Sequence, residues 1–322
     1  MKKVLVTLIA VCFTLGLTVG VMAAEPEIST SGTIEFKISG TSEEGEASGL
    51  FKAGDVLVDY NVSFTSGPWQ AVVSPEFDIG EEPALAECDA YITYSGEAFT
   101  LTLDPTGIDN GIFDIYAYGP GCAIDGAPNI PSNAGLKLEV PFDTSSFYLV
   151  VNNQPDPEDS ESAAFCFGGG LSTTISDLSL DLAFNSNPIT DDAWYGSSYG
   201  VKLGYSLEAL SLTAEYGAWS PGDDEVWMEE GAGEVKSGSG YYFEMGYTMP
   251  GGDTLTLSYT GSDKNLNGAG YGPSAHEYSK IKGVYSHALA EAVALSFEVA
   301  STDDGYAEDT ITTWSGKLSI SF

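Results

Sequence analysis

Val293-Ala-Leu-Ser-Phe-Glu-Val299 is the stretch that decides the fold, because apolar side chains alternate in it with small or charged ones. An apolar residue at every second position is the period of a β-strand with one apolar and one polar face. The same period recurs along the chain, in stretches that include 56–64, 178–184, 241–249 and 255–259. No comparable helical pattern follows the first 24 residues, so the sequence predicts an all-β protein.

The expected strands are joined by connections that are alternately long and short. Ser66-Gly67-Pro68 and Leu207-Glu208 are short, whereas 40–54 and 105–133 are long. This order is typical of an up-and-down antiparallel transmembrane β-barrel, which has tight turns at one end and long loops at the other. A soluble β-sandwich shows the same alternation of faces without this order of connections.

The pattern predicts sixteen strands. Four of them, near 33, 97, 134 and 146, look shorter than the roughly 9–11 residues that a tilted span needs, so fourteen strands is the alternative. The sixteen expected strands are 33–39, 55–65, 69–79, 88–95, 97–104, 134–140, 146–152, 162–172, 177–186, 196–206, 209–218, 238–248, 253–262, 276–287, 291–301 and 311–322.

The first 24 residues have the three-part layout of a secretory signal peptide. Lys2 and Lys3 precede an apolar run over 4–21, and small residues follow it. The competing interpretation is a membrane-anchoring helix. We therefore predict a signal peptide over 1–24 and a β-barrel over 25–322.

The chain is strongly acidic, with 47 Asp and Glu residues against 11 Lys and no Arg. Loss of Lys2 and Lys3 with the signal takes the formal net charge from −36 to −38. Nucleic acid is excluded as a partner, because a phosphate backbone needs a basic surface, and cations are favoured instead. Acidic loop clusters such as Asp223-Asp224-Glu225 either attract or bridge cations or form a solvated, repulsive surface. None has the spacing of an EF-hand loop, so no metal site is predicted.

Catalysis and cofactors have no support in the sequence. The two histidines, His276 and His287, lie near opposite ends of one expected strand and cannot share a site. Three cysteines remain after the signal, Cys88, Cys122 and Cys166. In an oxidising compartment they allow one disulfide and one thiol, and the spacing does not choose the pair. We expect a protein that is not an enzyme and has no cofactor.

The chain ends on Trp314-Ser-Gly-Lys-Leu318-Ser-Ile320-Ser-Phe322. Alternating apolar residues and a terminal aromatic resemble the last strand of bacterial outer-membrane proteins, which closes the barrel and is read by the barrel assembly machinery. By this resemblance Trp314, Leu318, Ile320 and Phe322 are the closure and sorting residues. With the signal peptide and the loop order, the whole mature chain resembles the sixteen-stranded general porins. The resemblance implies a homotrimer in the cell outer membrane, in contact with its lipid.

General porins fold their third outer loop into the pore as a constriction, between strands five and six. The stretch 105–133 takes that place here, so the resemblance implies Asp109, Phe113, Asp114 and Asp125 as constriction residues. The stretch has no clear match to the Pro-Glu-Phe-Gly-Gly-type motif of the family. The lack of arginine also removes the cluster that usually faces the loop.

Four lysines belong to strands that become neighbours or near-neighbours when the barrel closes: Lys37, Lys280, Lys282 and Lys317. They are candidates for a basic strip opposite the constriction, where opposed charges would sort ions and orient solutes. The competing interpretation is that each lysine pairs with a carboxylate of the inner wall, such as Glu35 or Glu298. The expected function is passive diffusion of small hydrophilic solutes and ions with a preference for cations. The alternative is a structural or adhesive barrel with a blocked lumen.

Overall fold

The computed structural model describes residues 27–43, 46–47, 56–78, 84–104, 134–155, 163–186, 197–220, 238–262, 278–303 and 310–322. Within these ranges, no helix is long and apolar enough to cross a membrane. The strands are β1 (Glu27–Glu43), β2 (Glu46–Ala47), β3 (Val56–Ser66), β4 (Trp69–Asp78), β5 (Ala84–Ser95), β6 (Thr100–Asp104), β7 (Ala134–Phe142), β8 (Ser145–Pro155), β9 (Ala163–Ile175), β10 (Leu178–Ser186), β11 (Ser197–Leu207), β12 (Leu210–Ser220), β13 (Gly238–Thr248), β14 (Thr254–Ser262), β15 (Tyr278–Ala290), β16 (Val293–Asp303) and β17 (Ile311–Ser321).

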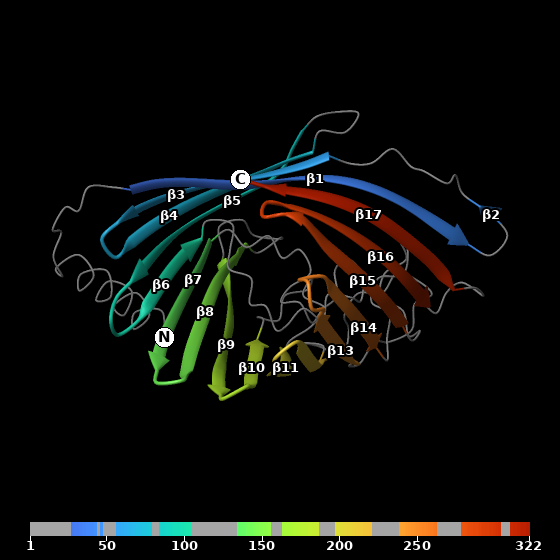
Figure 1. Cartoon of the computed structure of the whole chain (residues 1–322). Helices are drawn as coiled ribbons and strands as arrows, with labels where there is room; N and C mark the ends of the chain where they lie inside the picture. Colours follow the sequence, from blue (N-terminus) through green and yellow to red (C-terminus); the bar gives the residue numbers. More distant parts are fainter. Residues whose placement is uncertain are drawn as a thin grey trace.

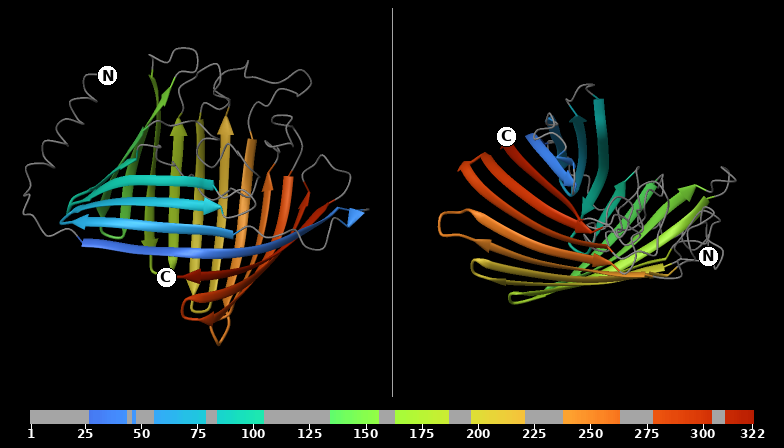
Figure 2. Two further views of the ribbon diagram at one scale, coloured as in Figure 1. Left: turned by 90° about the horizontal axis from the view of Figure 1, so that it is seen from above. Right: turned by 90° about the vertical axis from the view of Figure 1, so that its right-hand side faces the viewer.

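The strands form one closed antiparallel barrel. From β3 to β17 each strand pairs with the next in sequence, β17 pairs with β1, and β1 pairs with β3 (Figure 1). The two-residue β2 only folds back on the end of β1, so the barrel has sixteen strands. The blue strands β1, β3 and β4 run steeply across the direction of β8 to β13 (Figure 2), as expected when tilted strands lie on opposite walls of a barrel. The prediction of an all-β up-and-down barrel is confirmed.

The alternative of fourteen strands is wrong, because the expected strands that looked too short all take part in the sheet. The first is 17 residues long, and those at 134 and 146 extend to 9 and 11 residues. Only β6 remains short, at 5 residues, yet it pairs with β5 on one side and β7 on the other. Hydrogen bonds to the strands on both sides therefore keep β6 in the sheet despite its short length.

Short turns join neighbouring strands at one end of the barrel. The first residue of four of these turns has a left-handed conformation: Gly67 (φ 58°), Asp143 (φ 52°), Ser176 (φ 55°) and Glu208 (φ 45°). A positive φ at this position gives the turn the twist that suits two antiparallel strands. The turns fix the register of each hairpin, and a shift by one residue would move every side chain to the other face.

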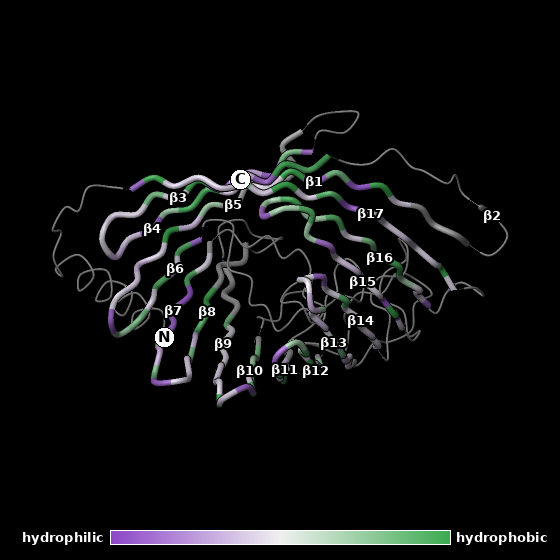
Figure 3. Tube along the Cα trace, viewed as in Figure 1, coloured by the Kyte–Doolittle hydropathy of each residue, from purple (hydrophilic) through white to green (hydrophobic). Residues whose placement is uncertain are grey.

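The outer face of the barrel is apolar and the inner face is polar. Phe243 and Leu257 are 52% and 49% exposed, whereas Glu215 and Thr260, at the other parity, are 3% and 2% exposed. Side chains on the convex side of a curved sheet spread apart and those on the concave side crowd together, so the exposed apolar set is the outer one. Figure 3 shows the corresponding alternation of green and purple along the strands. This is the reverse of a soluble core and matches a barrel surrounded by lipid.

Aromatic side chains gather near both ends of the outer face. Around the short turns Tyr94 lies between Trp69 and Phe99, with ring centroids 5.0 and 5.5 Å away. Toward the other end Tyr241 and Tyr259 lie 5.8 Å apart. Two such belts are the arrangement that amphipathic rings adopt at the two membrane interfaces.

Candidate functional site

The inner wall of the barrel is lined by charged side chains from nearly every strand. They reach it because inward residues occupy every second position of each strand and the register keeps them level with inward residues of the neighbours. Carboxylates outnumber lysines on this wall. The inward carboxylates are Glu27, Glu35, Asp59, Glu76, Asp78, Asp104, Glu139, Asp181, Glu215, Glu244 and Glu298, and the inward lysines are Lys37, Lys137, Lys202, Lys280, Lys282 and Lys317.

Two of the four lysines predicted to form a basic strip meet at the seam where the barrel closes. Lys37 of β1 and Lys317 of β17 are direct register partners. The ammonium of Lys317 donates a hydrogen bond to Oε1 of Glu35 at 2.8 Å, and Ser319 Oγ donates to the same oxygen at 3.3 Å. At least one member of the predicted strip is therefore neutralised by a carboxylate, as the competing interpretation holds.

The other two lysines lie farther along the same inner wall. Lys280 is opposite Thr260 and Thr302, and Lys282 is opposite Ser258 and Ala300. Lys317 is level with Ser286, four residues along β15 from Lys282, which is about 14 Å of strand. In the register of the sheet, the four lysines thus form two groups on one wall and not a single row.

Lys202 and Glu215 form an ion pair that the sequence analysis did not single out. They are register partners on β11 and β12, with Nζ and Oε1 2.7 Å apart. Asp181 faces Lys202 from β10 and Tyr242 faces Glu215 from β13, so the pair lies in a polar row across four strands. The Tyr242 hydroxyl donates a hydrogen bond to Glu244, the next inward residue of β13. The carboxylate of Glu215 is almost completely buried, whereas the side chain of its partner Lys202 is partly exposed.

Lys137, another inward lysine, packs against an aromatic ring. The ammonium of Lys137 lies 4.9 Å from the ring centre of Tyr148 and 3.3 Å from Glu139. A Cβ at Gly170 would come within 2.6 Å of the Tyr148 ring, so the ring covers this glycine. The arrangement keeps the Tyr148 side chain against the wall and the lysine over its face.

The predicted closure residues lie on the outer face of β17. Trp314, Leu318 and Ile320 are level with Gly40, Phe36 and Ile34 of β1. At the chain end Phe322 N donates to Gly32 O, and Gly32 N donates to Phe322 O, both at 3.1 Å. The Phe322 ring stacks on Tyr60, with centroids 6.4 Å apart.

The ring of Phe322 packs directly against the backbone of Gly32. A Cβ at this position would come within 2.6 Å of Phe322 Cζ and 2.5 Å of the Asp59 carbonyl oxygen. We expect Gly32→Val to displace the Phe322 ring and to cost about 2 kcal/mol, the usual range for overpacking. The folded fraction of the refolded chain, read from its migration on a gel without heating, measures the loss.

Gly283→Val is the matched control, because Gly283 is also outward and a Cβ there would meet nothing within 4 Å. Deleting Phe322 removes the same ring together with two backbone hydrogen bonds, so it should impair closure at least as strongly as Gly32→Val. Equal folded fractions for Gly32→Val and Gly283→Val would show that the packing of Phe322 against Gly32 does not contribute to stability.

Several predicted residues lie outside the described part of the chain. These are the signal peptide over 1–24, the constriction residues Asp109, Phe113, Asp114 and Asp125, and Cys122. Cys88 lies on β5 and Cys166 on β9, with three strands between them. Four strand spacings amount to about 19 Å along the wall, far more than the reach of a disulfide. A bond between Cys88 and Cys166 is therefore excluded.

No metal centre is assembled by the residues that the structure describes. No group of three His, Cys, Asp or Glu is placed to hold a metal ion in these ranges. His287 lies on the outer face near a short turn, where its Nδ1 is 2.6 Å from Oδ1 of Asp253.

The geometry is that of a closed sixteen-stranded antiparallel barrel of the porin type. No protein-family model matches the sequence, and no curated protein matches it either. Among solved structures the barrel is similar to OmpF of Salmonella typhi in complex with daunomycin, with a TM-score of 0.65 at 14% identity, over 94% of this chain and 100% of that one. It is also similar to a triple mutant of the Rhodopseudomonas blastica porin, with a TM-score of 0.62 at 14% identity, over 92% and 100% of the two chains. The fold is thus that of the bacterial general porins.

Proposed function

We propose that the protein is an outer-membrane porin, a passive diffusion channel for small hydrophilic solutes and ions with a preference for cations. The observation that carries this proposal is a closed sixteen-stranded barrel with an apolar outer face and a charged inner face. A sheet can lie in lipid only when it is closed, and a barrel of this size leaves room for water inside. The proposal includes no enzymatic activity and no cofactor.

The cation preference is supported by the sign of the charges on the inner wall. Carboxylates such as Asp59, Asp181 and Glu298 outnumber the lysines there, and Lys317 is already paired with Glu35. A wall of one sign in a confined space raises the local concentration of counter-ions. Lys280 and Lys282 offset part of this field and would act locally, as a short basic patch on one side.

The remaining features of the proposal follow from the resemblance to general porins. They are insertion by the barrel assembly machinery, a homotrimer, and a constriction formed by Asp109, Phe113, Asp114 and Asp125 in the third outer loop. Removal of residues 1–24 as a signal peptide is proposed from the three-part layout of that stretch. The apolar outer face of the barrel suits contact with outer-membrane lipid, and the belts of aromatic residues suit its two interfaces.

Cation selectivity is tested by the reversal potential across a salt gradient in a planar bilayer. We expect a steady conductance and a cation-directed potential. The potential should weaken at high salt, because the Debye length falls from roughly 10 Å at 0.1 M to 3 Å at 1 M. Replacing Asp109, Asp114 and Asp125 together by asparagine should weaken it further.

Glu298→Gln tests the contribution of the inner wall to selectivity, and Asp303→Asn is its matched control. Glu298 is inward and Asp303 lies at the end of β16 on the outer parity, so only the first should reduce selectivity. An anion-directed potential would mean that the lysines control the channel. A correctly folded barrel with no conductance would contradict the porin proposal and favour a structural or adhesive barrel with a blocked lumen.

A further inference from the structure

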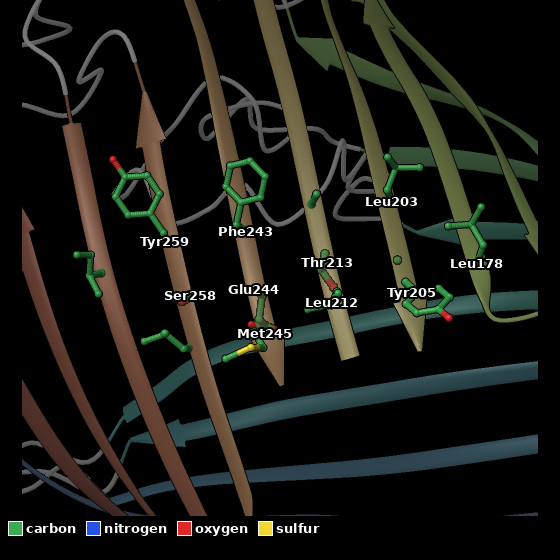
Figure 4. Close-up of a pocket in the computed structure, with 14 residues that line it drawn as sticks. Leu178, Leu203, Tyr205, Leu212, Thr213, Phe243, Glu244, Met245, Ser258 and Tyr259 are labelled. Carbon is green, nitrogen blue, oxygen red and sulfur yellow. The ribbon is translucent and has the colours of Figure 1, made fainter. Parts of the chain in front are cut away.

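A groove of about 620 Å³ lies on the outer wall, across β10 to β15. Two rows of outward side chains border it, as Figure 4 shows: Tyr259, Phe243 and Leu203 in one row, and Met245, Leu212 and Tyr205 in the next. Within the first row Ala214 lies between Phe243 and Leu203 and leaves a gap above the sheet. The groove is apolar and spans six strands, or about 24 Å.

The groove is open toward β15. Gly283 continues the second row next to Leu257, and a Cβ there would meet nothing within 4 Å. Along the β14 and β15 pair, the next outward residues toward the short turns are Leu255 and Tyr285, which are level with each other. An occupant of the groove can therefore continue along this strand pair to the end of the barrel.

A polar cluster stands where that path ends. Asp253, in the turn before β14, accepts a hydrogen bond from the Tyr285 hydroxyl at 2.7 Å, and its other oxygen is 2.6 Å from Nδ1 of His287. These contacts, first with Tyr285 and then with His287, hold the pKa of the Asp253 carboxyl below its usual range. Asp253 is thus a fixed negative charge about 14 Å of strand away from Leu257 and the groove.

The charges of the outer wall favour a cationic head group. All six lysines of the described strands face inward, so on the outer face an anionic group would meet Asp253 and no lysine. A second copy of this chain would bring the same outer face, on which the described strands carry no lysine to pair with Asp253. A phospholipid carries an apolar chain and a head group in one molecule, and a primary ammonium is a strong donor to a carboxylate.

We propose that this wall binds one phospholipid with a primary-ammonium head group, with an acyl chain in the groove and the ammonium against Asp253. The groove, at about 24 Å, is long enough for an acyl chain that crosses the roughly 15 Å of one leaflet. The inference rests on the membrane location that the proposed function includes, but not on conduction.

The test measures lipid retention by the full mature chain, refolded in detergent micelles and analysed by native mass spectrometry. The probes are phosphatidylethanolamine, phosphatidylcholine and phosphatidylglycerol with identical acyl chains. We expect one phosphatidylethanolamine to be retained in preference to the other two. Asp253→Asn should reduce its retention about tenfold, the change expected for one charge-assisted hydrogen bond, and remove the preference.

Two pairs of variants separate the head group from the chain. Asp143→Asn, in another short turn, is the control for Asp253→Asn and should leave retention unchanged. Gly283→Leu should reduce retention of all three lipids, whereas Ala71→Leu, on the outer face of β4, should not. Both leucines point away from the barrel, so the variants should still fold.

Equal retention of the three lipids by the unmodified chain and by Asp253→Asn would overturn the assignment of the head group. Unchanged lipid retention in Gly283→Leu would show that the acyl chain does not occupy the groove. A change of oligomeric mass in Gly283→Leu, without a change in bound lipid, would make this wall an interface between copies instead. Bilayer conductance is read independently: a chain that retains the lipid and does not conduct would contradict the porin proposal alone.

Discussion

Leu257→Arg is expected to destabilise the barrel by about 2–4 kcal/mol, the cost of placing arginine on a lipid-facing side near the middle of a membrane. Leu257 is outward, 49% exposed, and lies in the middle of β14 between Met245 and Gly283. A guanidinium at this position would lose its hydration to lipid tails and find no carboxylate among the outward residues that surround it. Unfolding by urea in lipid vesicles, followed by tryptophan fluorescence, measures the loss.

The control for this prediction is the residue next to it. Thr256 points inward, level with Gly246 and Val284, so Thr256→Arg places the same charge on the inner wall. We expect its cost to stay within about 0.5 kcal/mol, the usual range for a solvated surface substitution. Equal losses for both variants would indicate that the outer face does not meet lipid and that the barrel is soluble.

Lys202→Met is expected to cost about 3 kcal/mol. It leaves the buried Glu215 carboxylate without its ammonium partner at 2.7 Å, and a buried charge that loses its partner is strongly destabilising. We place the effect at the lower end of the range because the Lys202 side chain is itself 31% exposed. Chemical unfolding of the refolded barrel at pH 7 measures it.

Lys137→Met tests the same chemistry at an exposed pair. Lys137 and Glu139 are 34% and 37% exposed and 3.3 Å apart, and such pairs contribute only about 0–1 kcal/mol. Lys202→Met combined with Glu215→Leu should recover much of the loss, because no unpaired carboxylate then remains buried. A loss for Lys202→Met no larger than that for Lys137→Met would mean that water reaches Glu215 freely.

Most of the fold could be predicted because its signals are local. Alternation over five to seven residues identifies a strand, as in Val293 to Val299, and short turns such as Glu208-Ala209 fix each hairpin. The strand at 33–39 was underestimated, since β1 begins at Glu27 in polar residues whose pairing with β3 holds them in the sheet. The two-residue β2 has no periodicity to reveal it.

The inner wall could be predicted only in part, since its contacts depend on register. The pairing of Lys202 with Glu215 follows from counting outward from the two-residue turn at Glu208, so a signal for it was present in the sequence. The neutralisation of Lys317 by Glu35 joins the two ends of the chain, and no local pattern specifies it. The outer groove arises from gaps at Ala214 and Gly283, on strands far enough apart that only the assembled sheet reveals it.

The seam between β1 and β17 also sets the order of events in folding. The contact of Lys317 with Glu35 joins residues 282 positions apart, while each hairpin joins residues within a few positions of its turn. Hairpins form in microseconds, whereas the seam must wait until the last strand has been synthesised. Closing one loop of this length in a flexible chain would cost about 5 kcal/mol in entropy, and sequential pairing of the hairpins reduces that cost by bringing the ends together. A chain that has formed its hairpins but not this seam is a curved sheet with two unpaired edges, and such edges are prone to aggregate until Phe322 pairs with Gly32.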